Sequence, residues 1–222
     1  MLAQTDNPSS SALVGYSGEL QIPLEQFFFN VDQWVNTRAL ISDLKLPNHA
    51  FWAQDMNPSA VRKIVARHYL ASRLSIGLLT GSFRGRLALL SRDDWLRLGM
   101  CIAVLPQRGV IRHSMDGHFR RAVRQGFDED VINSLEQLGS VEDGPEFTGG
   151  AGAWRTPHTV ALGGVIAAVE QACSWPDPIR ARFYLHFEPQ EREVPPSVVG
   201  LNCHWLELVC KILFPKPHWL WS

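Results

Sequence analysis

The chain has 222 residues, enough for one large domain or two small ones with a substantial buried core. Hydrophobic residues make up 45% and charged residues 19%, which excludes a disordered chain. Lys and Arg number 21 and Asp and Glu 22, giving a formal net charge of −1. That balance excludes an overall field that would draw the chain onto DNA or an anionic membrane.

Cysteine usage and apolar segments indicate the compartment. Cys101, Cys173, Cys203 and Cys210 stand singly without a CxxC pair, which disfavours a zinc ribbon and indicates a reducing compartment. The N-terminal sequence has neither a basic region nor a long apolar stretch, so no secretory signal is expected. No run approaches the ~20 apolar residues that a membrane span requires. We therefore expect a soluble cytoplasmic protein.

The chain opens with residues 1–19, which are rich in Ser, Gly, Asn and Gln and predict a flexible arm. Ordered structure is expected to begin near Leu20. Asn57 is a suitable helix N-cap and Pro58 suits the first helical position. The residues that then recur at helical spacing are Val61, Val65, His68, Tyr69 and Ile76.

Further helices are expected up to residue 138. Ser91 and Asp94 form a capping box, and Pro106 ends the helical pattern that they begin. Asp128 is the expected cap of a later helix. The apolar residues that we assign to buried helix faces are Trp95, Leu98, Ile102, Leu105, Ile111, Met115, Phe119, Val123, Val131, Leu135 and Leu138.

Residues 139–154 are rich in glycine and predict an internal linker. A helix that is apolar nearly all round is expected from Pro157 to about Cys173. Because it carries Glu170 and is shorter than a membrane span, we expect it to be buried. The aromatic-rich segment Arg182–Phe187 is bounded by prolines and predicts a short strand.

The last predicted helix is capped by Ser197 and ends near Phe214. On this helix Cys203 and Cys210 lie roughly 10 Å apart, whereas one zinc ion needs sulfurs within roughly 4 Å of each other. We expect both cysteines to pack in the core, and we expect no metal and no cofactor. Together these signals predict a mainly α protein, a compact multi-helix domain over residues 20–222 with a minor β element near residues 182–187.

Trp219 and Trp221 follow the last predicted helix in the sequence PKPHWLW. Aromatic side chains favour buried and interface positions, so exposed tryptophans would be unusual on a monomer. Two interpretations stay open. The tryptophans fold back onto the core, or they bind a partner.

The segment Gln107–Gln125 is locally basic and is followed by acidic residues at 128–130 and 141–146. One interpretation is a solvated face with internal salt bridges. The other is a docking patch for an acidic protein surface, because arginine forms bidentate pairs with carboxylates and is enriched at interfaces. The candidate partner-binding residues in this segment are Arg108, Arg112, Arg120, Arg121 and Arg124.

Catalytic motifs are missing from the sequence. It contains no GxSxG, HExxH or HxE…PCxxC pattern. The neighbouring carboxylates Asp93 and Asp94 are explained by helix capping, and the glycines of Thr148–Pro157 lack the GK[ST] ending of a phosphate-binding loop. No enzymatic activity is predicted.

The order of these segments resembles the K-type accessory proteins of bacterial type III secretion systems, the family of Yop-translocation protein K and the rhizobial nodulation protein NolU. The resemblance lies in Ala71–Gly99, in Arg108–Gly139, and in the C-terminal third at Trp175–Phe187 and Cys203–Trp221. It covers about two-thirds of the chain.

The resemblance implies a structural adaptor without catalytic activity, at the cytoplasmic face of the inner membrane. Such proteins connect the cytoplasmic domain of the inner-membrane ring protein to the pod protein of the sorting platform. Two alternatives remain open. One is a secretion chaperone that binds an effector, and the other is a small metal-dependent hydrolase that uses His68, His113 and His118.

Overall fold

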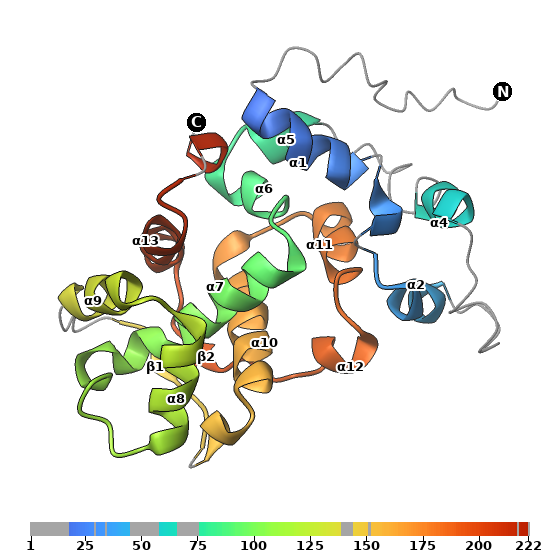
Figure 1. Ribbon diagram of the computed structural model, residues 1–222. Coiled ribbons are helices and arrows are strands. Elements are labelled where there is room, and N and C mark those ends of the chain that lie inside the picture. The colour runs from blue at the N-terminus through green and yellow to red at the C-terminus, as the bar shows by residue number, and fades with distance from the viewer. Residues whose placement is uncertain are drawn as a thin grey trace, which may run out of the picture. The chain divides into compact units, whose positions relative to one another are not determined.

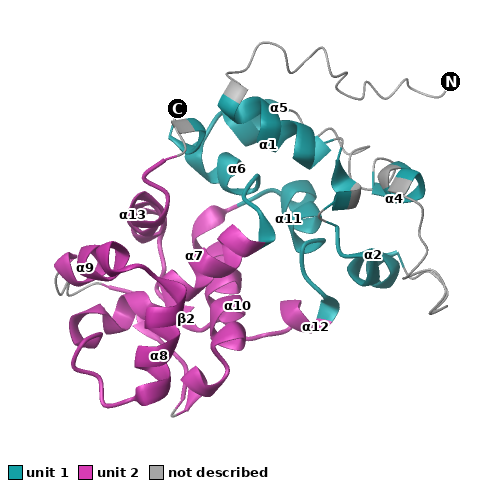
Figure 2. Ribbon diagram, in the orientation of Figure 1, with its two compact units in different colours: residues 1–92, 175–189, 217–222 teal, residues 93–174, 190–216 magenta. Residues whose placement is uncertain are grey.

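The structure is a computed structural model that describes residues 18–28, 30–33, 35–44, 58–65, 76–138, 144–150, 152–216 and 218–221 (Figure 1). The chain groups into two compact units, each assembled from segments that are distant in sequence (Figure 2). Unit 1 holds residues 1–92, 175–189 and 217–222, and unit 2 holds residues 93–174 and 190–216. The protein is mainly α, which confirms the predicted fold class. The single domain over residues 20–222 stays a prediction.

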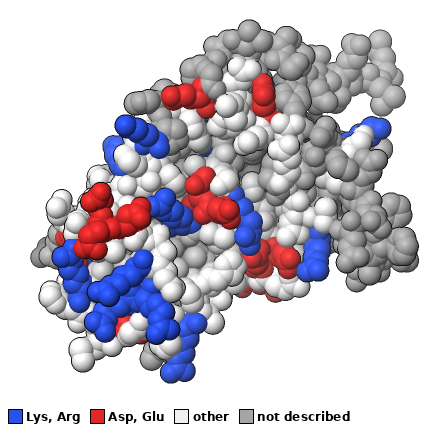
Figure 3. Space-filling model, viewed as in Figure 1, with Lys and Arg blue, Asp and Glu red and all other residues white. Residues whose placement is uncertain are grey.

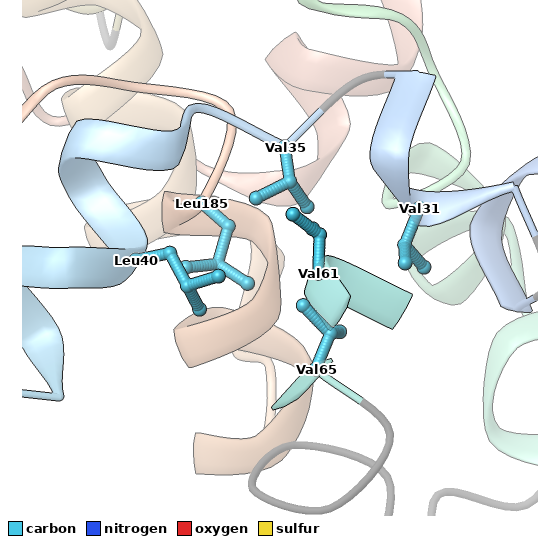
Figure 4. Packing of buried hydrophobic residues seen from close by; sticks show 6 residues of the cluster. All are labelled: Val31, Val35, Leu40, Val61, Val65 and Leu185. Carbon is cyan, nitrogen blue, oxygen red and sulfur yellow. The ribbon is translucent and has the colours of Figure 1, made fainter. Parts of the chain in front are cut away.

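Unit 1 is built from short helices around an apolar cluster. Val61 and Val65 lie one turn apart on one face of a helix, and Leu40 and Leu185 meet them from other segments (Figure 4). The backbone N–H of Asn36 donates to the carbonyl oxygen of Leu185 at 2.7 Å. The elements of unit 1 are α1 (Gly18–Phe28), η2 (Val31–Gln33), α2 (Thr37–Asp43), α4 (Pro58–Val65), α5 (Ile76–Thr80), α6 (Phe83–Leu87), α11 (Asp177–Tyr184) and η7 (His218–Leu220).

Unit 2 contains the longer helices and a small sheet. The elements that lie wholly or mostly in it are α7 (Arg92–Val104), η4 (Leu105–Val110), α8 (Gly117–Gly126), α9 (Glu129–Gln137), β1 (Glu146–Phe147), η5 (Ala153–Arg155), α10 (Pro157–Ala167), the π-helical η6 (Ala168–Cys173), α12 (Pro189–Arg192), β2 (Val198–Val199) and α13 (Cys203–Leu213).

Helices α7 and α10 approach each other closely in unit 2 because glycines meet at the contact. A Cβ atom on Gly99 would overlap the carbonyl oxygen of Ala161 and would lie 2.7 Å from Cγ2 of Val165. A Cβ atom on Gly164 would lie 2.9 Å from Cα of Gly99. The two backbones therefore fit together only without side chains at these positions.

The helix from Pro157 to Cys173 confirms the prediction of a buried apolar helix. Residues 160–169 are all buried, and Glu170 is exposed. Gln171 connects this helix to β2 and to the segment that follows it. Its side chain donates to the carbonyl oxygen of Val198 in β2 at 2.8 Å and accepts from the N–H of Leu201 at 3.1 Å. Within the described residues, no helix has the length and apolarity needed to cross a bilayer.

Several helix starts were predicted at the correct positions. Helix α4 begins at Pro58, and α7 begins directly after Ser91. Asp128 stands at the N-cap position of α9, but its side chain makes no capping hydrogen bond. Met115 does not extend the buried stripe and is 97% exposed, because α8 begins only after the cap residue Asp116. His68 and Tyr69 lie outside the described residues.

The β element was placed wrongly. Residues 177–184 form helix α11, and the sheet instead pairs β1 with β2 in antiparallel register, Glu146 opposite Val199. The buried residues Ile179, Arg182 and Phe183 recur at intervals of three and four, which is the helical period rather than the alternation of a strand. The predicted strand was wrong because the prediction rested on the aromatic content of this segment and not on the spacing of its buried residues.

The cap of the last helix was also placed wrongly. Helix α13 begins at Cys203, and the side chain of Asn202 accepts a hydrogen bond from the N–H of Trp205 at 3.1 Å. Ser197 directly precedes β2, and its backbone oxygen accepts from the N–H of Thr148 at 2.9 Å. The predicted end of the helix near Phe214 is confirmed.

The predicted arm and linker have different outcomes. Residues 1–17 and 139–143 lie outside the described residues, and α1 already begins at Gly18. The described part of the predicted linker contains β1 and most of η5. Trp154 in η5 is buried against Phe119 with ring centroids 4.8 Å apart, so this stretch packs within unit 2.

Candidate functional site

Helix α8 carries the candidate site because its two faces have opposite character. The Asp116 carboxylate caps the helix by accepting from the N–H groups of His118 and Phe119 at 2.8 and 3.2 Å. Phe119 and Val123 are buried on one face of the helix. Charged residues occupy the opposite side of the helix, so α8 presents a basic surface to solvent.

The five arginines of the basic segment have different environments. Arg108 is buried, with its guanidinium carbon 5.1 Å from the ring centroid of Trp205, and it donates to the carbonyl oxygen of Leu105 at 2.9 Å. Its cation–π contact and its hydrogen bond hold it inside unit 2. Arg108 therefore adds little to the exposed charge of the basic segment.

Arg112 is held by acidic side chains of α9. Its Nη2 lies 2.7 Å from Glu129 Oε1, its Nε lies 3.0 Å from Glu136 Oε2, and it also donates to Asn133. This network is the internal salt bridging that the first interpretation expected. For Arg112, that interpretation is confirmed.

Arg120 and Arg124, which lie four residues apart on one side of α8, form what we call the α8 arginine face. Arg121 is next to Arg120 in the sequence and lies about 100° further around the helix. All three are exposed, and no carboxylate in the part of the chain that the structure describes pairs with them. In Figure 3, basic side chains gather over the position of α8, beside acidic side chains over α9. This face is the candidate docking surface, and its binding of a partner stays a prediction.

The two C-terminal tryptophans pack onto their own chain within unit 1. Trp219 is 8% exposed, and Trp221 stacks on Phe83 with ring centroids 4.9 Å apart and planes 10° apart. This packing agrees with the interpretation that they fold back. Partner binding by Trp219 and Trp221 stays a prediction.

The four cysteines, which stand singly in the sequence, are all free and all belong to unit 2. Burial raises the pKa of the Cys210 thiol well above its usual value, and the nearby Cys173, Cys101 and Cys203 thiols raise it further. Burial likewise raises the pKa of Cys101. Thiols held protonated in this way are poor nucleophiles and poor metal ligands.

Two of the three histidines of the hydrolase alternative lie in the part of the chain that the structure describes. His113 and His118 are exposed in unit 2, and His68 lies outside the described residues. Among the residues that the structure describes, no three His, Cys, Asp or Glu side chains gather closely enough to hold a metal ion.

Unit 1 contains a buried basic pair that the sequence interpretation missed. The guanidinium carbon of Arg182 lies 4.1 Å from the ring centroid of Phe27, and His186 is buried nearby. Burial lowers the pKa of Arg182 to about 9, so it stays charged at neutral pH. The spacing of three residues between Ile179 and Arg182, which places both on one face of a helix, was the available signal.

The chain matches no family model, and no curated protein or solved structure matches it either. The resemblance to the K-type accessory proteins therefore stands as a proposal.

Proposed function

We propose that this chain is a non-enzymatic structural adaptor of a bacterial type III secretion system. It links the cytoplasmic domain of the inner-membrane ring protein to the pod protein of the sorting platform. It lies in the bacterial cytoplasm and reaches the inner membrane through these protein partners. The proposal starts from the resemblance of Ala71–Gly99 and Arg108–Gly139 to the K-type accessory proteins.

The observation that carries the proposal is the α8 arginine face. Arg120 and Arg124 are exposed on one side of α8, and neither of them pairs with a carboxylate among the described residues. Guanidinium groups form forked hydrogen bonds with carboxylates, and arginine is enriched in protein interfaces. A protein partner with an acidic surface would supply the missing carboxylates.

Co-purification tests this function. The chain is produced together with the inner-ring cytoplasmic domain and the pod protein of the same genome, and size exclusion with light scattering reports the mass. We expect a stable complex with at least one of the two proteins. The absence of a complex with either, at tens of micromolar protein, would contradict the proposal.

A further inference from the structure

A hollow of about 200 Å³ opens beside the α8 arginine face, between α8 and α9 of unit 2. Its apolar lining comes from Ile111, Val123 and Ile132, and Arg120 and Arg124 line it as well. These two arginines lie four residues apart, so they project from the same side of α8. The hollow therefore combines apolar surface with two guanidinium groups.

Of the three arginines that line the hollow, only Arg112 has an acidic partner among the described residues. Arg112 and Glu129 also line it, and they pair with each other at 2.7 Å. Arg120 and Arg124 have no such carboxylate among the described residues. Arg112 is thus paired within the chain, whereas the guanidinium groups of Arg120 and Arg124 can attract a negatively charged group of another molecule.

Size and lining identify the class of ligand. Pockets for small-molecule ligands are commonly about 300–1,000 Å³, so this hollow is small for a metabolite and suits one or two side chains of a partner. Its apolar lining favours an apolar side chain next to the carboxylate. Nucleic acid fits less well, because the lining has no aromatic ring on which a base could stack and includes the Glu129 carboxylate.

We propose that this hollow binds a short acidic and apolar segment of a partner protein. An aspartate or glutamate of the partner pairs with Arg120 and Arg124, and a neighbouring apolar side chain enters the hollow. The identity of the partner rests on the proposed adaptor function, while the chemistry of recognition rests on the lining of the hollow.

The variants separate this hollow from general basic charge. Arg121 follows Arg120 by about 100° around the helix and does not line the hollow. Arg155 in η5 is exposed and is also absent from the lining. R120E/R124E and R121E/R155E therefore change the net charge equally, and only the first pair changes the hollow.

The probe is a fluorescein-labelled peptide of alternating glutamate and leucine, titrated with the full chain and followed by anisotropy. We expect R120E/R124E to weaken binding at least about tenfold and R121E/R155E to change it less than about twofold. Methyl resonances of Ile111 and Ile132 should shift when the peptide binds. Circular dichroism checks that both variants keep the helical content of the parent chain.

Three results would overturn the proposal. They are equal weakening by both double variants, equally tight binding of the same peptide with glutamine in place of glutamate, and displacement of the peptide by a short RNA. Peptide binding as expected without a complex with either secretion protein would uphold the hollow and refute the adaptor function. A complex with a secretion protein that R120E/R124E leaves intact would uphold the adaptor function and refute the hollow as its binding site.

Discussion

His186 shows how burial decides the charge of a single residue. It is 4% exposed, and burial, together with the positive charges of Arg182 and Arg92, lowers its pKa to about 3. The imidazole is therefore neutral in the folded chain at neutral pH. In the unfolded chain its pKa is about 6.5, so below that pH the unfolded state binds a proton that the folded state does not.

This difference predicts acid sensitivity. As the pH falls below about 6.5, the folded state loses stability, by about 1 kcal/mol between pH 6.5 and pH 5.5, and the loss continues towards pH 3. His186→Gln should remove this contribution, because glutamine does not titrate. Urea denaturation of both proteins at the two pH values measures it. An unchanged pH dependence in the variant would show that His186 is not the group responsible.

Helix α13 illustrates capping at the scale of an element. The Asn202 side chain satisfies the N–H of Trp205, which would otherwise lack a partner within the helix. Asn202→Ala should lower the free energy of unfolding by about 1 kcal/mol, measured by urea denaturation.

Ser197→Ala is the matched control for this cap. Ser197 was the cap predicted from sequence, but it lies before β2, and its hydroxyl has no hydrogen-bond partner among the described residues. We expect this substitution to leave the free energy of unfolding nearly unchanged, because no capping bond is lost. Equal destabilisation by both substitutions would contradict the assignment of Asn202 as the cap.

Among the helices and strands, the features that the sequence predicted correctly are those that depend on neighbouring residues in the chain. The starts of α4, α7 and α9 depend on residues within one turn, and all three agree with the structure. The pairing of β1 with β2 joins segments that are far apart in sequence, so no nearby residue signals it. The prediction of a strand at residues 182–187 was wrong because it rested on aromatic content, whereas the buried residues of this segment recur at the helical period.

The candidate site was predicted only in part, for the same physical reason. The sequence located the basic segment, but it could not separate its arginines, because their partners come from other elements. Arg108 is buried against the ring of Trp205 in α13, and Arg112 forms ion pairs with glutamates of α9. The hollow beside Arg120 and Arg124 depends on how α8 packs on α9.

For the whole molecule, the central claim is that Arg120 and Arg124 of α8 bind a partner protein of the secretion system. Surface charges of this kind act mainly through complementarity with a partner, since exposed ion pairs within a chain contribute only about 0–1 kcal/mol to stability. Reversing them should therefore reduce partner binding while leaving the fold of the chain in place.

The most direct measurement is the equilibrium affinity of the full chain for the inner-ring cytoplasmic domain and for the pod protein, compared among the parent chain, R120E/R124E and R121E/R155E. We predict that R120E/R124E weakens binding of at least one partner about tenfold or more, while R121E/R155E stays within about twofold of the parent chain. Equal affinities for all three proteins, with unchanged helical content, would contradict the account.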